Sequence, residues 1–566
     1  MAEIRDMVLR DHMGARLFGL PGWGRIASNI KLFIRRCVVD SAAIPPLDAV
    51  YKAIYRMHVS YALRCLKTLP HTRSIYVARG VATGEIVSGV SDVDLVVLGE
   101  WSDPEQANVM AGLRRLSALS PLYDASLWQH AHTIVGLHSL YATDLYYQCR
   151  FDQGRTQWKL LFGEDVIARL APPPTERLAG GYYMDIRNWW DTFKHSAFGT
   201  GPTARDSIFR HSVAFKAVGE IVNKSAGLRG NPLRDSRKKA IADVIVQSRG
   251  WDRAYLERLD RSAKTRHRRF EGDIREETFQ FLLRHLDGMH ARIGAAPSFQ
   301  NAGGAAMQLD APREEMLLTA AAQAHVGEVV AHVKRQWIGY VGAFLVPSIS
   351  FFTLDDLMLL IEIDPARPPA VEQIRALCRF HEKAGKELRQ RVALLLLLEH
   401  GAVQVESVSP LELWHLVLCR EANPDVFLQL GNPESAIDGS PKSIDGPVVW
   451  TRFAAALIDE EVAVRRAAAA AMSGDGSMTS IELVRNIWRQ IQIEVVQRSQ
   501  TTHPVIPLTP RAVQRALAGL GVPDNPALDQ LREVYEAELN GRDTGLRPED
   551  LGVIVGRAMT FLTQRP

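Results

Sequence analysis

Two aspartates separated by one residue give the first indication of chemistry in this 566-residue chain. Asp92 and Asp94 flank Val93 at the start of the apolar run VDLVVL. Side chains two positions apart lie on the same face of a strand, so both carboxylates face one way while Val93 and Leu95 face the core. Paired carboxylates repel each other unless a cation lies between them, and Mg²⁺ is held by one or two carboxylates together with phosphate oxygens. The spacing therefore predicts a magnesium site.

A third carboxylate follows on the next candidate strand, residues 122–127 (LYDASL), where Asp124 stands at its centre. Three acids can hold two metal ions about 4 Å apart, one activating an attacking hydroxyl and the other stabilising the leaving pyrophosphate. We predict that Asp124 completes the site. Asp144 lies within reach in the sequence and is the alternative.

The connection between the two predicted strands, residues 74–78 and 93–98, is rich in glycine. Gly80, Gly84 and Gly89 lie in it. Because glycine has no Cβ, the backbone N–H groups of such a turn can approach phosphates closely. The turn is therefore a candidate for holding a triphosphate.

This combination resembles the nucleotidyltransferase superfamily that includes DNA polymerase beta, poly(A) polymerases and the aminoglycoside nucleotidyltransferases. The shared pattern is a glycine followed by Ser or Gly, a gap of about ten residues, and two acids that alternate with apolar residues. Here Gly80-Val81 precedes Ser91 and the run Asp92-Val93-Asp94-Leu95. The resemblance covers roughly residues 50–175 and implies transfer of NMP from an NTP, with ATP as the expected nucleotide, to an acceptor hydroxyl with release of pyrophosphate.

The resemblance also implies roles for individual residues. Asp92 and Asp94 bind Mg²⁺ or Mn²⁺, Asp124 completes the metal site and aids deprotonation of the acceptor, and Gly80, Val81 and Ser91 hold the nucleotide. Val81 departs from the pattern, because family members place Ser or Gly there and valine has no hydroxyl. The alternative function is therefore a catalytically inactive nucleotidyltransferase fold that serves as a binding scaffold.

In the resembling enzymes a helical domain closes over the nucleotide. Apolar spacings predict helices over 183–195 and 207–222, on which Lys194 and Lys216 are candidate phosphate contacts. Each lysine fits equally well on a solvated polar face of its helix.

Basic residues are concentrated from Arg229 to Arg269, where thirteen Lys/Arg stand against five Asp/Glu. Such a stretch suits an RNA backbone, and Trp251 and Tyr255 offer stacking faces. A solvated helical face accounts for the same composition. The acceptor therefore stays open between a small molecule, a protein side chain and an RNA end.

The expected fold is an α+β N-terminal nucleotidyltransferase domain, with a small mixed sheet and helices, followed by mostly all-α helical domains. Composition shifts at Pro172–Pro174 and over residues 294–312 place the domain boundaries. We expect a helical extension, the catalytic domain, a helical closing domain, a linker and an α-helical C-terminal region, at residues 1–45, 46–175, 176–293, 294–312 and 313–566.

The composition excludes several classes of protein. The chain is 46% hydrophobic and 23% charged with a formal charge of +3, which excludes wholesale disorder and a nucleic-acid coat. Five scattered cysteines form no C-x-x-C pair, and the first residues are charged, so we expect a cytoplasmic protein. The uncharged stretch 336–354 is interrupted by Pro347, and we expect a buried helical hairpin there and no transmembrane segment.

Overall fold

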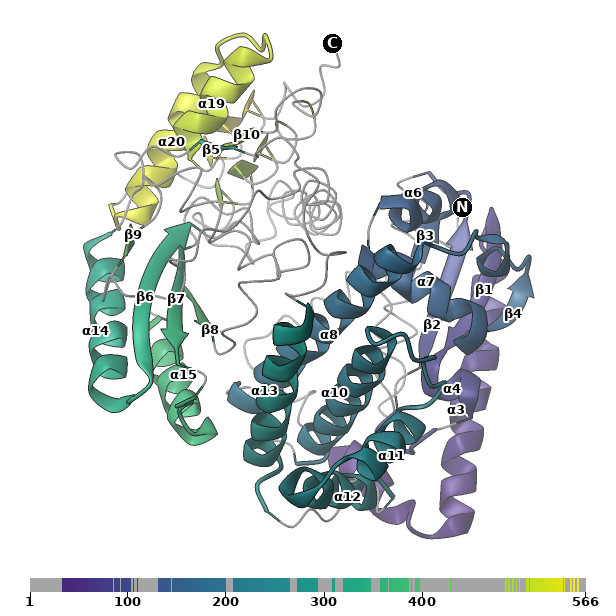
Figure 1. Cartoon of the computed structure of the whole chain (residues 1–566). Helices are drawn as coiled ribbons and strands as arrows, with labels where there is room; N and C mark the ends of the chain where they lie inside the picture. Colours follow the sequence, from purple (N-terminus) through teal and green to yellow (C-terminus); the bar gives the residue numbers. More distant parts are fainter. Residues whose placement is uncertain are drawn as a thin grey trace. The chain divides into compact units, whose positions relative to one another are not determined.

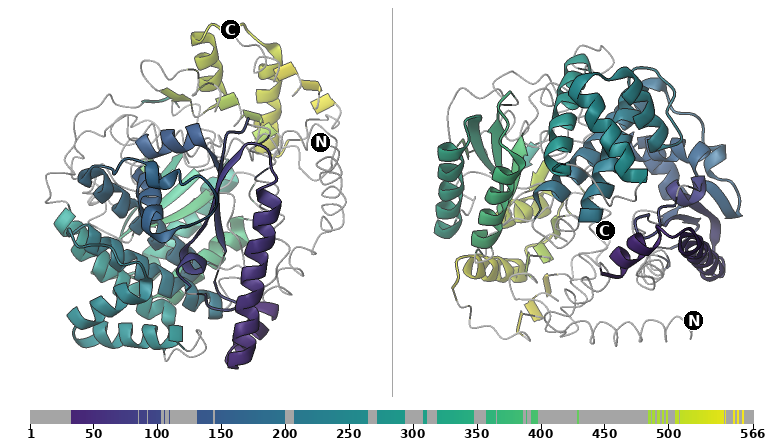
Figure 2. Two further views of the ribbon diagram at one scale, coloured as in Figure 1. Left: turned by 90° about the vertical axis from the view of Figure 1, so that its right-hand side faces the viewer. Right: turned by 90° about the horizontal axis from the view of Figure 1, so that it is seen from below.

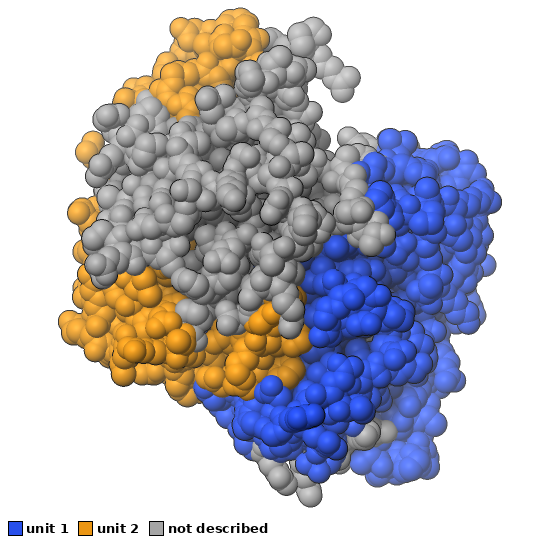
Figure 3. All heavy atoms as spheres, in the orientation of Figure 1, with its two compact units in different colours: residues 1–142, 146–278 blue, residues 143–145, 279–566 orange. Residues whose placement is uncertain are grey.

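The computed structural model divides the chain into two compact units, residues 1–142 with 146–278 and residues 143–145 with 279–566 (Figure 3). Each unit contains its own four-stranded sheet. Besides scattered single positions, the structure describes residues 33–84, 86–91, 93–102, 131–143, 145–199, 207–264, 272–293, 308–310, 319–347, 357–364, 366–385, 392–397, 428–429, 505–507 and 509–542.

The first sheet is mixed, with the strand order β3-β2-β1-β4. Strand β1 pairs antiparallel with β2 and β4, whereas β2 pairs parallel with β3. The predicted strands at 74–78 and 93–98 are confirmed as β1 and β2, and the predicted strand at 122–127 lies outside the described residues. The bounds are β1 (Thr72–Ala78), β2 (Asp94–Gly99), β3 (Ala131–Thr133) and β4 (Lys159–Gly163).

Helix α3 (Pro45–Leu66) covers one face of this sheet (Figure 2). The alternation of strand side chains decides which residues meet the helix. Val93 and Leu95 face the core, as predicted, and pack against α3. The core cluster on this face contains Tyr55, Val59, Ala62 and Leu66 of α3 and the odd-numbered residues Ile75, Val77, Val93, Leu95 and Val97.

Helices α6 (Ile134–Thr143) and α7 (Leu145–Gln157) contribute to the core on the opposite face. The even-numbered residues Tyr76, Val96 and Leu98 pack there with Leu137, Tyr141 and Phe151. Asp94 has the same parity as Val96 and begins β2, so the catalytic candidate lies at the end of a strand that is buried on both faces.

A largely helical region follows the first sheet, as expected (Figure 1). The predicted helices at 183–195 and 207–222 lie within α8 and α10, which pack closely against each other. The helices are α8 (Thr175–Phe198), α10 (Ser207–Gly227), α11 (Arg237–Gln247), α12 (Gly250–Lys264) and α13 (Ile274–Ile293).

The expectation of an all-helical region from residue 313 onward is wrong, because the second unit contains a sheet of strand order β8-β7-β6-β9. Strand β6 occupies most of the stretch 336–354, where we expect a helical hairpin, and β7 and β8 are further strands in the region expected to be helical. Uninterrupted apolar runs fit a buried strand as well as a buried helix, so periodicity did not separate them. The elements are α14 (Ala320–Gln336), β6 (Tyr340–Pro347), β7 (Leu357–Ile363), α15 (Val371–Gly385), β8 (Val392–Leu397) and β9 (Leu428–Gln429).

The second sheet repeats the topology of the first. In both, the first and second strands are antiparallel, the third is parallel to the second, and the fourth is antiparallel to the first on its other side. Both first strands also show a register irregularity near their start, after Thr72 in β1 and after Tyr340 in β6. The connections differ, because 79–93 contains three glycines and the shorter 348–356 (SISFFTLDD) contains none.

The rest of the second unit contains a helical core and a small sheet. Trp488, Leu531 and Tyr535 belong to this core, which α19 (Pro510–Gly519) and α20 (Pro526–Leu539) help to form. Strand β5 (Gln308–Asp310) pairs parallel with β10 (Val505–Pro507). Among the described residues, no helix is both long enough and apolar enough to cross a membrane.

Candidate functional site

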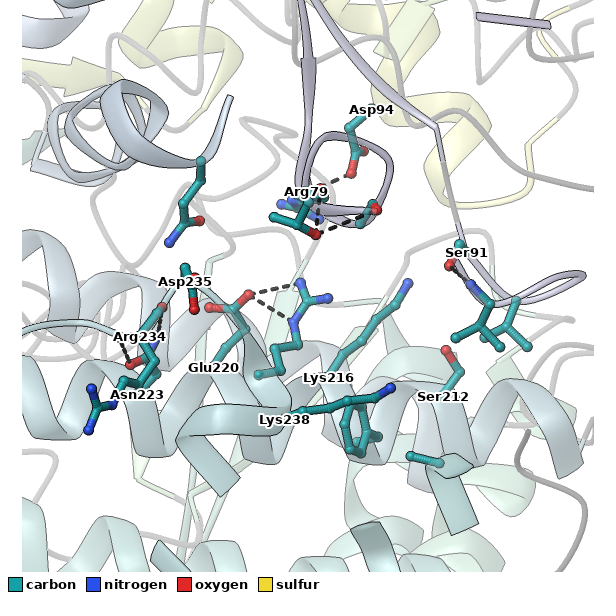
Figure 4. A pocket seen from close by; sticks show the side chains of 18 residues that line it. Arg79, Ser91, Asp94, Ser212, Lys216, Glu220, Asn223, Arg234, Asp235 and Lys238 are labelled. Atoms are coloured by element: carbon teal, nitrogen blue, oxygen red, sulfur yellow. Dashed lines mark hydrogen bonds and ion pairs between the residues drawn. The ribbon is translucent and has the colours of Figure 1, made fainter. Parts of the chain in front are cut away.

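A cavity in the first unit brings together the turn after β1, the start of β2 and the facing sides of α10 and α11 (Figure 4). Its volume is about 110 Å³. Ligand sites for drug-sized molecules begin at about 300 Å³, so a nucleotide requires some of the lining side chains to move. The charged lining residues are Arg79, Lys216, Arg234, Arg237 and Lys238, with Asp94, Glu220 and Asp235.

Asp94 and Arg79 form the sheet side of the cavity. Asp94 lies opposite Ala78 in the β1–β2 register, its side chain is 3% exposed, and its Oδ2 lies 3.5 Å from Arg79 Nε. The guanidinium of Arg79 lies 6.0 Å from the ring centroid of Trp189 on α8. The cation beside the predicted metal ligand is therefore an arginine of the same chain.

Arg79 begins the short helix α4 (Arg79–Thr83) with φ at 57°, a left-handed conformation that favours glycine. The left-handed conformation that favours glycine is therefore adopted by Arg79, one residue before Gly80.

Val81 does not touch the cavity. Its side chain packs partly buried against the core between α3 and the sheet, whereas Gly80 and Thr83 line the cavity. The prediction that Val81 contacts the nucleotide is therefore not supported by its position. Because Val81 is not a lining residue, the absence of a hydroxyl at residue 81 does not change the cavity lining.

Ser91 lines the cavity and also closes the turn before β2. Its Oγ accepts a hydrogen bond from Val87 N at 2.7 Å, and its own N–H donates to Val87 O at 2.8 Å. Tyr55 on α3 donates to Ser91 O at 3.1 Å. Ser91 thus lines the cavity, and its hydroxyl already accepts the hydrogen bond that closes the turn.

Gly89 has φ at 78°, but its close contacts point away from the cavity. A Cβ there would lie 2.9 Å from Val39 Cγ2 and 3.0 Å from Arg35 O. Arg35 Nε donates to Gly89 O at 3.0 Å. This glycine therefore fits the turn against the 33–41 helix, and of the three glycines only Gly80 lines the cavity.

Of the two lysines predicted to contact phosphates, Lys216 lies in the cavity lining and Lys194 does not. Lys216 lines the cavity from α10, and its side chain extends toward Arg79 and Asp94 (Figure 4). Lys194 lies with Nζ 5.5 Å from the ring centroid of Trp190 and is not a lining residue. Arg234, Arg237 and Lys238 complete the cationic side of the cavity.

A buried ionic network lies beneath the cavity. Lys224 Nζ, 1% exposed, lies 3.4 Å from Asp185 Oδ2 and 3.7 Å from Glu220 Oε2. Arg237 Nη2 lies 2.8 Å from Glu220 Oε1, and Arg150 Nη2 lies 3.0 Å from Asp185 Oδ1. Removing one partner of such a buried pair typically costs about 3–5 kcal/mol. The network therefore fixes α8, α10 and α11 at the cavity floor.

Glu220 is the acid of this network that lines the cavity. Burial alone would raise the pKa of its carboxyl, but the nearby charges of Arg237, Lys224, Arg150 and Arg79 outweigh burial and lower the pKa to about 2. Glu220 is therefore an anion at physiological pH that binds Arg237. Glu220 is not among the predicted site residues, and its i,i+4 spacing from Lys224 is the signal in the sequence that points to it.

The remaining metal-ligand candidates, Asp92 and Asp124, lie outside the described residues, as does Asp144. In the described part of the chain no group of three or more His, Cys, Asp or Glu side chains is arranged to hold a metal ion. Asp94 alone of the predicted ligands is placed. A carboxylate at a strand end beside a cavity lined by several lysines and arginines still matches the donors that Mg²⁺ takes together with substrate phosphates.

The basic stretch folds mainly as α11 and α12, and many of its charges are paired. Arg234 binds Asp243, Lys239 binds Asp235, and Arg253 binds Glu257. Tyr255 is fully buried, with its hydroxyl 2.7 Å from Thr278 Oγ1, so of the two predicted stacking faces only Trp251, 43% exposed, is accessible. Arg266, Arg268 and Arg269 lie outside the described residues.

A second cavity, of about 320 Å³, adjoins the first and shares Asn223 and Arg234 with it. Asn223 holds the shared wall in place, because its side chain donates to Arg234 O at 2.9 Å and accepts from Arg234 N at 2.8 Å. Arg229, Asn231 and Gln247 line its far side.

No protein-family model matches this chain, and no curated protein is similar to it in sequence.

Proposed function

We propose that this protein is a metal-dependent nucleotidyltransferase that transfers NMP from an NTP, with ATP as the expected nucleotide, to an acceptor hydroxyl and releases pyrophosphate. The observation that carries the proposal is the position of Asp94, at the end of a buried strand and directly across one cavity from Lys216 and Lys238. A carboxylate that faces lysines across a small cavity suits a metal–triphosphate complex, in which the metal meets the acid and the phosphates meet the bases.

In this proposal Asp94, with Asp92 two residues before it, holds Mg²⁺ or Mn²⁺, which neutralises phosphate charge and activates the acceptor hydroxyl. Lys216 and Lys238 bind the phosphates by charge-assisted hydrogen bonds, and the N–H groups around Gly80 approach them without Cβ interference. Asp124 remains the proposed third carboxylate. The nucleoside and the acceptor extend into the adjoining cavity past Asn223.

The test is transfer of label from each α-³²P-labelled NTP with Mg²⁺, using the purified chain alone and with added RNA or cell extract as acceptor. We expect transfer with one nucleotide preferred, and its loss in Asp92→Asn and Asp94→Asn. Glu100→Gln is the matched control, because Glu100 follows the opposite end of β2 and is exposed. Metal-independent labelling, or labelling that survives both aspartate changes, would contradict the proposal.

Two observations favour the inactive scaffold as the second candidate. Arg79 already supplies a cation to Asp94, and the cavity is smaller than a nucleotide. The two candidates differ in Arg79→Gly, which suits φ at 57° and removes that cation. An enzyme should then bind Mn²⁺ more tightly, by about tenfold if one competing ion pair is lost, in a calorimetric titration. A scaffold should bind no Mn²⁺ in either form.

A further inference from the structure

Helices α11 and α12 form a hairpin whose surface, together with the segment that precedes it, is basic. From residue 229 to residue 263, seven Lys or Arg residues are exposed, whereas one acidic residue is exposed and the other four are half-buried. Both helices pack against α10, and the exposed residues lie on their remaining surface (Figure 1). The exposed basic residues are Arg229, Arg234, Lys238, Lys239, Arg249, Arg253 and Arg261.

Three of these cations are not engaged elsewhere in the described part of the chain. Arg234, Lys239 and Arg253 each form an ion pair with a neighbouring acid, and Lys238 lines the candidate nucleotide site. A polyanion can bind the remaining cations without displacing a carboxylate, and it gains free energy from the counterions that it releases. The three remaining cations are Arg229, Arg249 and Arg261.

The α11–α12 hairpin extends from the first cavity to the turn between its two helices. Lys238 near the start of α11 and Ala263 near the end of α12 both line that cavity. Arg261 is two residues from Ala263, whereas Arg249 lies in the turn at the other end of the hairpin. The helix between these ends is about 15 Å long at 1.5 Å per residue, which matches about four stacked nucleotides at about 3.4 Å each.

Apolar side chains are exposed at the turn end of the hairpin. Val246 is 81% exposed and Trp251 is 43% exposed, and no other large hydrophobic residue is exposed among the described residues from 145 to 293. Val246 and Gln247, which end α11, line the second cavity together with Arg229. Cations and an exposed indole therefore occur together at this end.

The indole of Trp251 is held in a defined orientation. Its ring stacks on that of Tyr255, with the centroids 5.5 Å apart and the planes 9° from parallel. Tyr255 is fully buried, and its hydroxyl lies 2.7 Å from Thr278 Oγ1. One face of the indole is thus covered by a fixed ring, while much of the residue stays exposed. An aromatic ring that is already oriented loses little entropy when a base stacks on it.

We propose that the α11–α12 hairpin binds single-stranded nucleic acid, with a base stacked on Trp251 and phosphates beside Arg229, Arg249 and Arg261. A single strand engages both kinds of side chain, because its bases can stack on aromatic rings while its phosphates bind cations. A duplex offers only its phosphates, since its base faces are already stacked on one another. The proposal does not depend on the proposed activity, because this binding requires neither a nucleotide nor a metal ion.

The first test measures the salt dependence of binding by the full chain, using fluorescence anisotropy of labelled 12-nucleotide RNA and DNA of one sequence without Mg²⁺ or nucleotide. If the three cations each neutralise one phosphate, the Kd should rise about 20-fold between 50 and 200 mM salt. In Arg249→Gln the rise should fall to about 7-fold. Arg64→Gln, at an exposed arginine of α3, is the matched control and should keep the 20-fold rise.

The second test addresses stacking on the indole. Trp251→Ala should weaken binding about fivefold or more and leave the salt dependence unchanged, because a stacked base is lost and no charge is removed. Trp251→Phe keeps an aromatic face and should retain most of the affinity. Circular dichroism of each variant checks that the fold is kept.

Binding of either the RNA or the DNA strand, with these losses, supports the proposal, and the tighter of the two identifies the preferred sugar. Absence of binding to both strands at 50 mM salt would overturn it. So would affinities that Trp251→Ala and Arg249→Gln leave unchanged, or a duplex of the same sequence bound as tightly as the single strand. Binding to phosphatidylserine–phosphatidylcholine vesicles without binding to either strand would show that the surface recognises an anionic membrane instead.

Discussion

At the scale of single residues, the cavity is defined by charges that sequence spacing could not bring together. Asp94 was predictable, because an acid at the start of an apolar strand with a second acid two residues earlier is a local pattern. The position of Arg79 beside Asp94 was not predictable. It depends on a left-handed backbone conformation at residue 79, which brings Arg79 Nε to 3.5 Å from Asp94 Oδ2. The buried ion pair of Lys224 with Asp185 could not be predicted either, because lysine is normally a surface residue and Asp185 is on another helix.

The two lysines on the helical side provide a matched pair for a residue-scale prediction. Lys216→Met should weaken ATP binding about tenfold, the value of one charge-assisted hydrogen bond, because Lys216 lines the cavity. Lys194→Met should leave the affinity unchanged, because Lys194 lies on Trp190 outside the lining. Fluorescence titration with a labelled ATP analogue measures both. Equal losses, or a larger loss at Lys194, would contradict the placement of the site.

A pair of histidines in the second unit leads to a prediction on pH. His325 Nε2 and His381 Nδ1 lie 2.9 Å apart on α14 and α15. Burial lowers the pKa of both imidazoles from 6.5, and His325 lowers the pKa of His381 further. The unfolded chain therefore binds more protons than the folded chain below pH 6.5, so this contribution to stability is complete above pH 6.5 and is lost as the pH falls toward the lowered pKa values.

Urea unfolding at a series of pH values measures this effect. The double variant His325→Gln/His381→Gln should lose less stability than the parent chain between neutral pH and about pH 5. His58→Gln is a positive control: burial lowers the pKa of His58 to about 4, so this variant should also lose less stability than the parent chain over the same pH range. Parallel pH curves for the parent and the double variant would contradict the prediction.

At the scale of elements, strands β1 and β2 and helices α3, α8 and α10 were predictable, because alternation and 3.6-residue spacing are strong in them. Strands β6, β7 and β8 were not. Their runs are YVGAFLVP, LMLLIEI and VALLLL, in which almost every position is apolar. Burial on both faces removes the alternation that identifies a strand, and α15 leads into β8 over only a few residues.

The turn between β1 and β2 supports a prediction at this scale. Gly84→Ala should lower the free energy of unfolding by about 1–2 kcal/mol, because φ is 79° and the space around its Cβ is open. Gly89→Ala should cost about 1–3 kcal/mol more, because its Cβ would also meet Val39 and Arg35. Urea denaturation compares the two. A smaller loss for Gly89→Ala would show that the turn does not pack on the 33–41 helix as described.

At the scale of the whole molecule, the chain contains two sheets of one topology, each accompanied by helices. The two sheets differ in the connection between their first and second strands, which in the first sheet lines the candidate site. The first sheet has a long connection with glycines between its first two strands, and the second has a shorter connection without glycine between β6 and β7. This repetition was invisible in the sequence, because the two halves share no fixed period and the strands of the second were not recognised.

The difference between the two connections predicts how many nucleotides one chain binds. Backbone N–H groups can cradle phosphates where glycine allows close approach, which favours a single site in the first unit. We therefore propose that Asp94 and the cavity around it form a single nucleotide site, in the first unit.

Calorimetric titration of the full chain with a non-hydrolysable ATP analogue and Mg²⁺ tests this claim most directly. We predict one nucleotide per chain, with binding lost when Mg²⁺ is chelated and in Asp94→Asn, and kept in Glu100→Gln. Two nucleotides per chain would contradict the restriction to the first unit. No binding under any condition, or binding that survives both chelation and Asp94→Asn, would contradict the assignment of the site.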